Sequence, residues 1–474
     1  MRGEWGLGAV AIAAALLGWA SCAAAQDAPA APAADEQQPP QSPHAGGFWE
    51  RDLLTGDWGG IRTDWETRGV QLGANYIGEI LGNPTGGVRR GAIYEGSLEL
   101  LLTLDLEKIA GWSGATVHAN AYQIHGRGLS ANDLGNNLLV ASGIEAERST
   151  RLFDLWLEQH LWSNLVSVRI GQLAADEEFI ISQYASLFVN STFGWPGITT
   201  TDLPSSGPSY PLSTPGVRVK LQPTDQLSLM AAVFNGDPAG RGQGTPQSRD
   251  PSGTSFRVND DAFAIVEGAY ALNQEKDATG LPGTYKLGGW YHSGQFADQR
   301  FDAAGLSLAN SASSGVPGQH RGDYGLYAVV DQLVWRAPES KDQGLGVFLR
   351  LSGSPSDRNE VDFYADGGVN YKGLLPSRGD DVLGLGLAYA HISDAASSLD
   401  RDLNVFNGTS HPVRDYEMAL ELTYRAQLTP WWTVQPDLQV IFHPGGHVPD
   451  PTDPTHTRPI GDAVVVGVRT GIAF

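Results

Sequence analysis

Eight residues carry the side chains that could bind a small solute rich in hydroxyl groups. An arginine fork and a carboxylate can pair with neighbouring hydroxyl groups, and an aromatic face can stack on an apolar ring. For any one of them, solvation of a wet surface is the commoner role, and for Trp195 anchoring of its own loop is as good an explanation. For the set, we expect a solute-contacting subset. The candidates are Glu99, Trp156, Glu158, Arg169, Trp195, Arg350, Glu421 and Arg469.

The alternation of side chains along strands places these residues. In the last segment, 462–474, the even positions are apolar or Thr470, while the odd positions are small and include Arg469. Successive side chains of a strand point to opposite faces, so one face is apolar and the other is exposed to water. A strand of this kind that ends on an aromatic, here Phe474, is typical of an outer-membrane barrel.

The same period of two recurs along the chain, although two of the segments (261–272 and 322–336) have no purely apolar face. We predict an all-β fold: a transmembrane antiparallel up-and-down β-barrel of about 16 strands, an even number as closure requires. The predicted strands are 69–81, 92–106, 114–126, 151–161, 165–173, 216–222, 226–235, 261–272, 283–295, 322–336, 344–354, 361–372, 382–393, 414–428, 431–443 and 462–474.

The connections between these segments support the same topology. Those after even-numbered strands are mostly short, and most of those after odd-numbered strands are long, as in barrels with short periplasmic turns and long outer loops. The longest, 174–215, is the third outer loop and is rich in Phe, Ile and Trp. A loop so apolar must pack against something. We expect it to fold into the lumen and narrow it.

The N-terminal region indicates export. Residues 1–25 have the apolar core and small-residue cleavage site of a signal peptide, and 26–48 form an Ala/Pro/Gln-rich flexible tether. A short periplasmic N-terminal segment, 49–68, then offers a helix before the outer-membrane barrel of 69–474. The single cysteine, Cys22, lies in the leader, so we expect a mature protein without disulfides.

Composition and motifs argue against several functions. The net charge of −22 disfavours a nucleic-acid partner, because a phosphate backbone needs a basic surface. We find no catalytic constellation and predict no cofactor; Gly384-Leu-Gly386 lies in a strand-like segment without a following helix. His443 and His447 flank Pro-Gly-Gly. A metal clip is one interpretation, but solvated loop histidines are commoner, so we predict no metal site.

Seven segments of the chain carry recognisable motifs. They are Leu53-Leu-Thr-Gly-Asp-Trp-Gly-Gly-Ile-Arg62, Leu152-Phe-Asp-Leu-Trp-Leu-Glu-Gln159, Arg169-Ile-Gly-Gln172, Ser186-Leu-Phe-Val-Asn-Ser-Thr-Phe-Gly-Trp-Pro196, Pro208-Ser-Tyr-Pro211, Thr214-Pro-Gly-Val217 and Ala232-Val-Phe-Asn-Gly-Asp-Pro238. Together these motifs resemble the carbohydrate-selective porins of the OprB type. The resemblance implies a Gram-negative outer-membrane porin that passes small sugars, foremost glucose-like monosaccharides, into the periplasm by diffusion. Its expected partners are outer-membrane lipid and small carbohydrates.

Other functions stay open at this point. The first alternative is a general porin, or a porin for another small solute. An outer-membrane barrel enzyme is disfavoured because no Ser/His or Asp/His group has a spacing typical of a catalytic site. A third alternative is a soluble exported sugar-binding β-sandwich, which differs from a barrel in that it would be extracted without detergent. A homo-oligomer, such as the trimer common among porins, is compatible with the sequence but has no identifiable interface.

Overall fold

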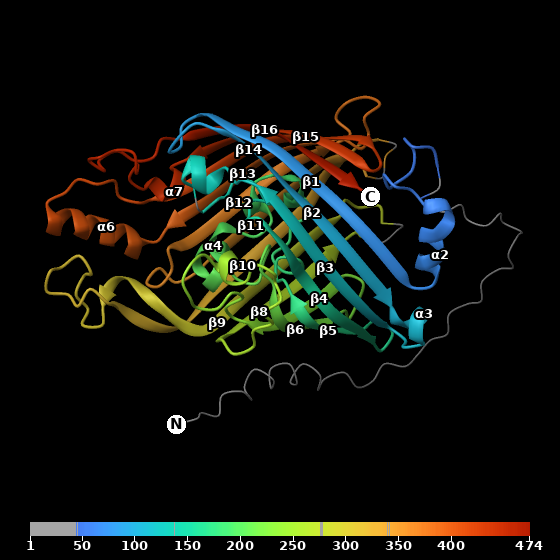
Figure 1. Cartoon of the computed structure of the whole chain (residues 1–474), viewed down its shortest axis with the longest axis horizontal. Helices are drawn as coiled ribbons and strands as arrows, with labels where there is room; N and C mark the ends of the chain where they lie inside the picture. Colours follow the sequence, from blue (N-terminus) through green and yellow to red (C-terminus); the bar gives the residue numbers. More distant parts are fainter. Residues whose placement is uncertain (1–43, 45, 137, 275–277, 339, 341) are drawn as a thin grey trace, which may run out of the picture.

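One closed antiparallel barrel dominates the molecule (Figure 1). The computed structural model describes residues 44, 46–136, 138–274, 278–338, 340 and 342–474. The predicted signal peptide and most of the predicted tether lie outside these residues. Each strand pairs with its neighbours in the sequence, and β1 pairs with β16 to close the ring.

The strands follow the predicted segments closely, so the predicted fold class is confirmed. The sixteen strands are β1 Val70–Thr85, β2 Ala92–Asp105, β3 Ala115–Gly126, β4 Ser149–Leu161, β5 Val166–Leu173, β6 Thr214–Leu221, β7 Leu227–Asn235, β8 Ala262–Leu272, β9 Gly283–Asp302, β10 Pro317–Arg336, β11 Gly344–Gly353, β12 Val361–Lys372, β13 Val382–Ile392, β14 Tyr416–Thr429, β15 Trp432–Phe442 and β16 Ala463–Ala473.

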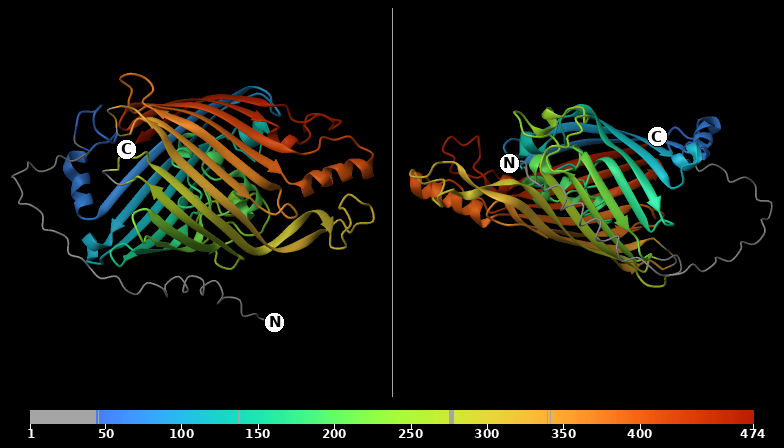
Figure 2. Two further views of the ribbon diagram at one scale, coloured as in Figure 1. Left: turned by 180° about the vertical axis from the view of Figure 1, so that it is seen from behind. Right: turned by 90° about the horizontal axis from the view of Figure 1, so that it is seen from below.

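The main difference from the predicted strands is the length of β9 and β10. Their pairing continues to Pro317 opposite Asp302, whereas alternation predicted that the first strand stops at 295 and the second starts at 322. The added residues are largely polar, so they carry no apolar alternation to detect. Figure 2 shows this hairpin projecting at the end of the barrel away from the C-terminus.

Short helices lie in the connections and in the N-terminal segment. None of the helices that the structure describes is long and apolar enough to cross a membrane. The predicted helix of the N-terminal segment is present as α2. The helical elements are η1 Trp58–Gly60, α2 Ile61–Thr67, α3 Leu106–Ala110, η2 Ser130–Leu134, η3 Ala185–Leu187, η4 Ser191–Phe193, α4 Gly197–Asp202, η5 Pro204–Ser206, α5 Pro246–Arg249, α6 Asp394–Asn407 and α7 Pro444–His447.

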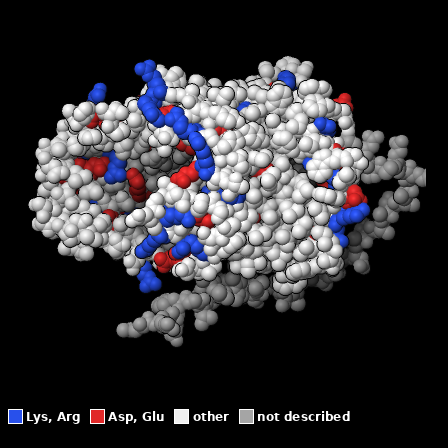
Figure 3. All heavy atoms as spheres, viewed as in Figure 1, with Lys and Arg blue, Asp and Glu red and all other residues white. Residues whose placement is uncertain are grey.

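The two faces of the barrel wall differ as predicted for β16. Val466 is 44% exposed, whereas Val465 beside it is fully buried. Large apolar side chains such as Leu287 and Leu326 are 70% exposed on other strands, and Glu421 on the opposite face of β14 is fully buried. On the side drawn in Figure 3, charged side chains gather mostly toward the ends of the barrel. The outer face therefore presents an apolar belt, as a surface covered by lipid tails would.

The connection 174–213, between β5 and β6, packs against strands that lie far from it in sequence. Its Phe179 and Ile180 share one buried apolar cluster with Phe263 of β8 and with Tyr327 and Val329 of β10. This contact explains why the inner faces of β8 and β10 carry apolar side chains among their charged ones: these side chains cover an apolar loop.

The N-terminal segment is attached to the C-terminal strand. The backbone N–H of Leu54 donates to the carbonyl of Ala473 at 2.8 Å, and Arg62 donates to the carbonyl of Phe474 at 3.0 Å. The described N-terminal segment and the C-terminus therefore lie at the end of the barrel that carries the short turns, which we call the short-turn end. The opposite end, which carries α6 and α7, is the long-loop end (Figure 1).

We predict that Val466→Arg impairs membrane assembly. A charge on the apolar belt costs about 2–4 kcal/mol near the bilayer midplane. On the opposite face Arg469 pairs with the buried Glu79, so the double variant Arg469→Ala with Glu79→Gln removes both charges together and should leave folding nearly intact. Unfolding by urea in lipid vesicles measures both, with Val466→Leu as the apolar control. Normal assembly of Val466→Arg, together with failure of the double variant, would contradict this assignment of the two faces.

Candidate solute-binding site

Two cavities lie along the inner face of the barrel and share one residue, Glu177. The first, of about 230 Å³, is lined by Glu99 of β2, Tyr122 of β3, and Asp176, Glu177 and Tyr210 of the connection 174–213. Its lining, as far as the structure describes the chain, contains three carboxylates and no lysine or arginine. This cavity favours a neutral or cationic occupant over an anion.

The second cavity, of about 350 Å³, is larger and carries both signs of charge. Glu177 and Glu178 line it together with Lys220 of β6, Glu267 of β8 and Lys286 of β9. Lys286 Nζ lies 3.4 Å from Glu267 Oε1, so this lysine is already paired with a carboxylate. Because Glu177 is an exposed residue that borders both spaces, the two cavities meet at its side chain.

Glu99 is held in one orientation by three neighbours. Asn75 donates to Oε2 at 2.9 Å, and Asn120 and Tyr122 each donate to Oε1 at 2.9 Å. The Tyr122 ring meets the Tyr210 ring edge to face, with centroids 5.1 Å apart. The first cavity thus combines fixed carboxylate oxygens with aromatic rings, which are the groups that a polyhydroxylated ring requires.

Asp176 is a carboxylate of this cavity whose pKa lies near neutrality. Its Oδ2 accepts a hydrogen bond from the backbone N–H of Tyr210 at 2.8 Å, which favours the charged form. Burial outweighs this bond and, with the neighbouring Glu177 carboxylate, raises the pKa of Asp176 to about 7. The charge of the first cavity therefore depends on pH in the physiological range.

A four-membered ion-pair cluster joins three strands to the connection. Glu158 of β4 accepts from Arg169 of β5 and from Arg218 of β6, at 2.9 Å in each case. The same two arginines reach Glu178 of the connection at 3.1 and 2.7 Å. Two guanidinium groups are thus balanced by two carboxylates, so the cluster offers no uncompensated positive charge to an anion.

Trp156 is part of the same assembly. The Arg169 guanidinium lies 3.7 Å from the centroid of the indole ring, a cation–π contact, and His118 stacks on the ring with centroids 4.8 Å apart. Among the predicted candidates, Trp156, Glu158 and Arg169 therefore form one cluster, and Glu99 lines the first cavity.

Arg350, another predicted candidate, binds the backbone of the connection. It is 1% exposed and pairs with Asp366 of β12. Its guanidinium also donates to the carbonyls of Ile180, Thr192 and Gly194, at 3.1, 2.8 and 2.9 Å. The fork of this arginine is thus used up in holding the loop, and none of its donors remains for a solute.

The last three candidates also contact the connection. Glu421 accepts from the backbone N–H groups of Val189 and Asn190 at 2.6 and 3.0 Å, and Arg469 donates to the carbonyl of Val189 at 3.4 Å. Trp195 is 7% exposed, and its indole N–H donates to a carbonyl of its own connection. Its place in the buried cluster favours anchoring over stacking on a solute.

Sequence reasoning missed several residues of the cavities and of the ion-pair cluster. Asp176, Glu177 and Tyr210 lie in the connection, where alternation gives no orientation, although Tyr210 stands in a motif that carried the family resemblance. Arg218 and Glu267 follow Val217 and Val266, whose side chains are 40% and 51% exposed on the outer face. Alternation within β6 and β8 could therefore have identified both as inner residues.

Comparison with known proteins agrees with this architecture. The family model described as carbohydrate-selective porin, OprB family, matches residues 89–474 of this chain. Porin B of Pseudomonas aeruginosa is 27% identical over 445 residues, which cover 89% of this chain and 91% of that protein. A protein of Acinetobacter baylyi named putative porin QuiX is 23% identical over 453 residues, covering 91% of this chain and 95% of its own.

Solved structures show the same fold. A high-pH structure of Pseudomonas putida OprB superposes with a TM-score of 0.78 and 26% identity, covering 90% of this chain and all of that one. A low-pH structure of Pseudomonas putida OprB gives a TM-score of 0.54 at 20% identity, covering 90% of this chain and 99% of that one. With the closed barrel and a family match over most of its length, the chain belongs to the OprB family of carbohydrate-selective porins.

Proposed function

We propose that this porin passes small neutral sugars, foremost glucose-like monosaccharides, through the outer membrane into the periplasm by passive diffusion. The two cavities that meet at Glu177 form the path. The observation that carries this proposal is the lining of the first cavity, where carboxylates and tyrosine rings stand without a lysine or arginine among the described lining residues.

Ion pairs in and beside the two cavities support a neutral solute. Arg169 and Arg218 are balanced by Glu158 and Glu178, and Lys286 lies beside Glu267, so these cations are engaged by carboxylates. An anionic solute would meet repulsion in the first cavity, whereas hydroxyl groups can donate to its carboxylates. Weak contacts of this kind orient a sugar and still allow it to leave.

The connection 174–213 supports selectivity as the third outer loop folded into the lumen. Side chains of β8, β11 and β14 hold it at Ile180, Thr192 and Val189. Its own Glu177 borders both cavities. In this proposal the loop converts a wide barrel into a narrow passage, and strand pairing supplies the stability of the wall.

The proposal predicts faster permeation of sugars than of matched non-sugars. Liposomes that contain the purified protein should swell faster in glucose than in an uncharged polymer of similar mass. Only the sugar has a ring and hydroxyl groups that can contact the tyrosine rings and carboxylates of the first cavity. Equal rates would identify a general porin, and swelling no faster than in protein-free liposomes would reject the channel.

We further predict that the ion preference of the channel depends on Asp176. As pH rises through about 7, Asp176 loses its proton and adds a negative charge beside Glu177, so preference for K⁺ over Cl⁻ should increase. Reversal potentials across planar bilayers in a KCl gradient, at pH 6 and pH 8, measure this change. In Asp176→Asn the increase should become much smaller.

Asp394→Asn provides the matched control, because Asp394 is an exposed carboxylate at the start of α6 and lines neither described cavity. It should leave the pH response intact. An unchanged response in Asp176→Asn, or its loss in Asp394→Asn as well, would show that ions are selected elsewhere.

Release of the loop should widen the channel. Arg350→Ala removes the donors to three loop carbonyls and leaves the buried Asp366 unpaired, at a cost of about 3–5 kcal/mol. The double variant Arg350→Met with Asp366→Leu releases the same carbonyls without an unpaired charge, so it should be more stable than Arg350→Ala. Single-channel conductance should rise in both variants.

The comparison of the two variants separates loop position from stability. The free energy of unfolding in urea should be higher for the double variant than for Arg350→Ala, while the conductance should rise by a similar amount in both. If conductance kept its wild-type value in both variants, the loop would not limit the passage.

A further inference from the structure

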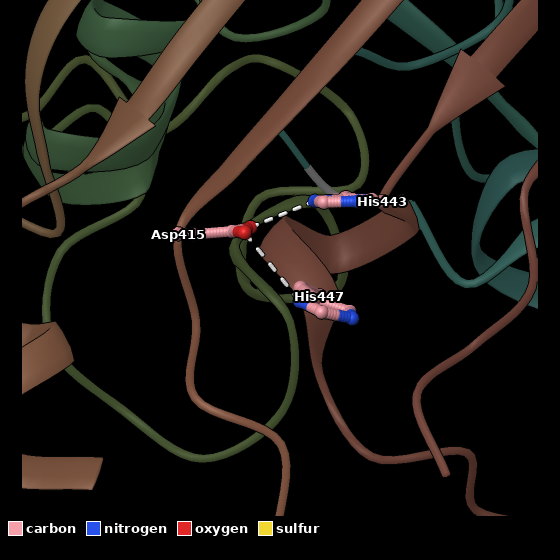
Figure 4. Close-up of side chains that lie close together, drawn as sticks. All are labelled: Asp415, His443 and His447. Carbon is pink, nitrogen blue, oxygen red and sulfur yellow. Dashed lines mark hydrogen bonds and ion pairs between the residues drawn. The ribbon is translucent and has the colours of Figure 1, made fainter. Parts of the chain in front are cut away.

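Three residues from two distant parts of the sequence meet at the long-loop end of the barrel (Figure 4). Asp415 precedes β14, while His443 precedes the short α7 after β15 and His447 is the last residue of α7. One ligand atom from each of the three lies within 4.8 Å of the other two. We call this group the His/Asp cluster. The sequence showed the two histidines but gave no sign of the carboxylate that completes it.

Both imidazole rings present the same nitrogen to the same carboxylate. His443 Nδ1 lies 2.8 Å from Asp415 Oδ1, and His447 Nδ1 lies 3.5 Å from Asp415 Oδ2. The two rings stack with centroids 4.2 Å apart and planes 19° apart. The Nδ1 atoms therefore lie on one side of the pair, where a single ion could meet both of them and the carboxylate (Figure 4).

Backbone contacts hold the cluster in place. The N–H groups of Gly446 and His447 donate to the carbonyl of His443 at 2.9 and 3.1 Å, and the N–H of Asp415 donates to the carbonyl of Gly446 at 3.1 Å. Glu417 of β14 accepts from the N–H of Gly445 at 2.6 Å. The folded protein thus positions the backbone around the three ligand side chains, which reduces the ordering that a bound ion would have to impose.

The cluster is accessible from solvent. The side chains of His443, His447 and Asp415 are 25%, 29% and 43% exposed. An ion can therefore reach all three residues without opening of the barrel. The net charge of −22 also favours accumulation of cations near the protein.

We propose that the His/Asp cluster binds one divalent transition-metal ion of the Zn²⁺ class. Two imidazole nitrogens and one carboxylate oxygen suit Zn²⁺, Ni²⁺ or Cu²⁺, whereas Ca²⁺ and Mg²⁺ prefer sites built from oxygen. Binding through Nδ1 requires neutral rings that carry their proton on Nε2. The three protein ligands leave a coordination position open to water.

The bound ion ties two outer connections together. Asp415 ends the connection between β13 and β14, and the histidines begin the connection between β15 and β16. The ion therefore crosslinks the loops on either side of the β14–β15 hairpin at the long-loop end. This role is separate from the solute path, since none of the three residues lines either described cavity.

One other histidine at the long-loop end, His320, also contacts carboxylates but does not belong to such a cluster. His320 contacts Asp298 through Nε2 at 2.8 Å and Asp357 through Nδ1 at 3.7 Å. Among the described ion pairs, neither of its two carboxylates contacts a second imidazole, so this histidine lacks the paired rings of the His/Asp cluster. His320→Ala is therefore the matched control for loss of a carboxylate-paired histidine.

The test is Zn²⁺ binding to the full-length protein in detergent, prepared without a polyhistidine tag and stripped with a chelator. Isothermal titration should show one saturable Zn²⁺ per chain and no comparable binding of Ca²⁺. His447→Ala and Asp415→Asn should each weaken Zn²⁺ binding at least about tenfold, by loss of a direct ligand. His320→Ala should bind as the wild type does.

A second measurement needs no variant. X-ray absorption of the Zn²⁺-loaded wild-type protein should show two imidazole ligands and additional oxygen ligands. Absence of stoichiometric Zn²⁺ binding, equal binding of Ca²⁺, unchanged affinity in both ligand variants, or a spectrum without two imidazoles would each overturn the proposal.

Discussion

Closure of the barrel is the constraint on which the rest of the structure depends. A strand edge left open in an apolar environment would carry unpaired N–H and C=O groups, each at a cost of several kcal/mol. Pairing of β1 with β16 removes both edges, and the bonds from the N-terminal segment to Ala473 and Phe474 reinforce the same seam. Once the ring is closed, every strand has one face outside and one inside, and the alternation of side chains decides what each face can do.

The inner face then has two tasks that compete for the same kinds of residue. Charged side chains such as Arg350 and Glu421 satisfy the backbone of the connection 174–213, which would otherwise bury unpaired polar groups. Other inner residues, with Asp176 and Glu177 of that connection, line open space. Most of the buried charge near the connection thus stabilises structure, and the residues facing the cavities are fewer than the polar inner face suggests.

The alternation of apolar and polar side chains could predict the strands, because the sequence of each strand alone shows which face is apolar and which is polar. It assigned Val466 and Arg469 to opposite faces of the last strand, which their exposures support. It could not separate Glu99, which lines a cavity, from Glu421, which binds loop N–H groups, because that difference depends on where a distant loop packs. For the same reason Asp176 and Glu177 escaped notice, and the carboxylate between His443 and His447 became visible only when folding brought Asp415 to them.

The central claim is that sugars travel through the space between Glu99 and Glu177. Sugar-induced block of the ion current through single channels tests it most directly, because a solute that occupies the path excludes ions from it. The account predicts a saturable block by glucose in the wild-type protein and a much weaker block in Glu177→Gln with unchanged barrel assembly. A glucose block of equal affinity in this variant, or no block in the wild type, would contradict the account.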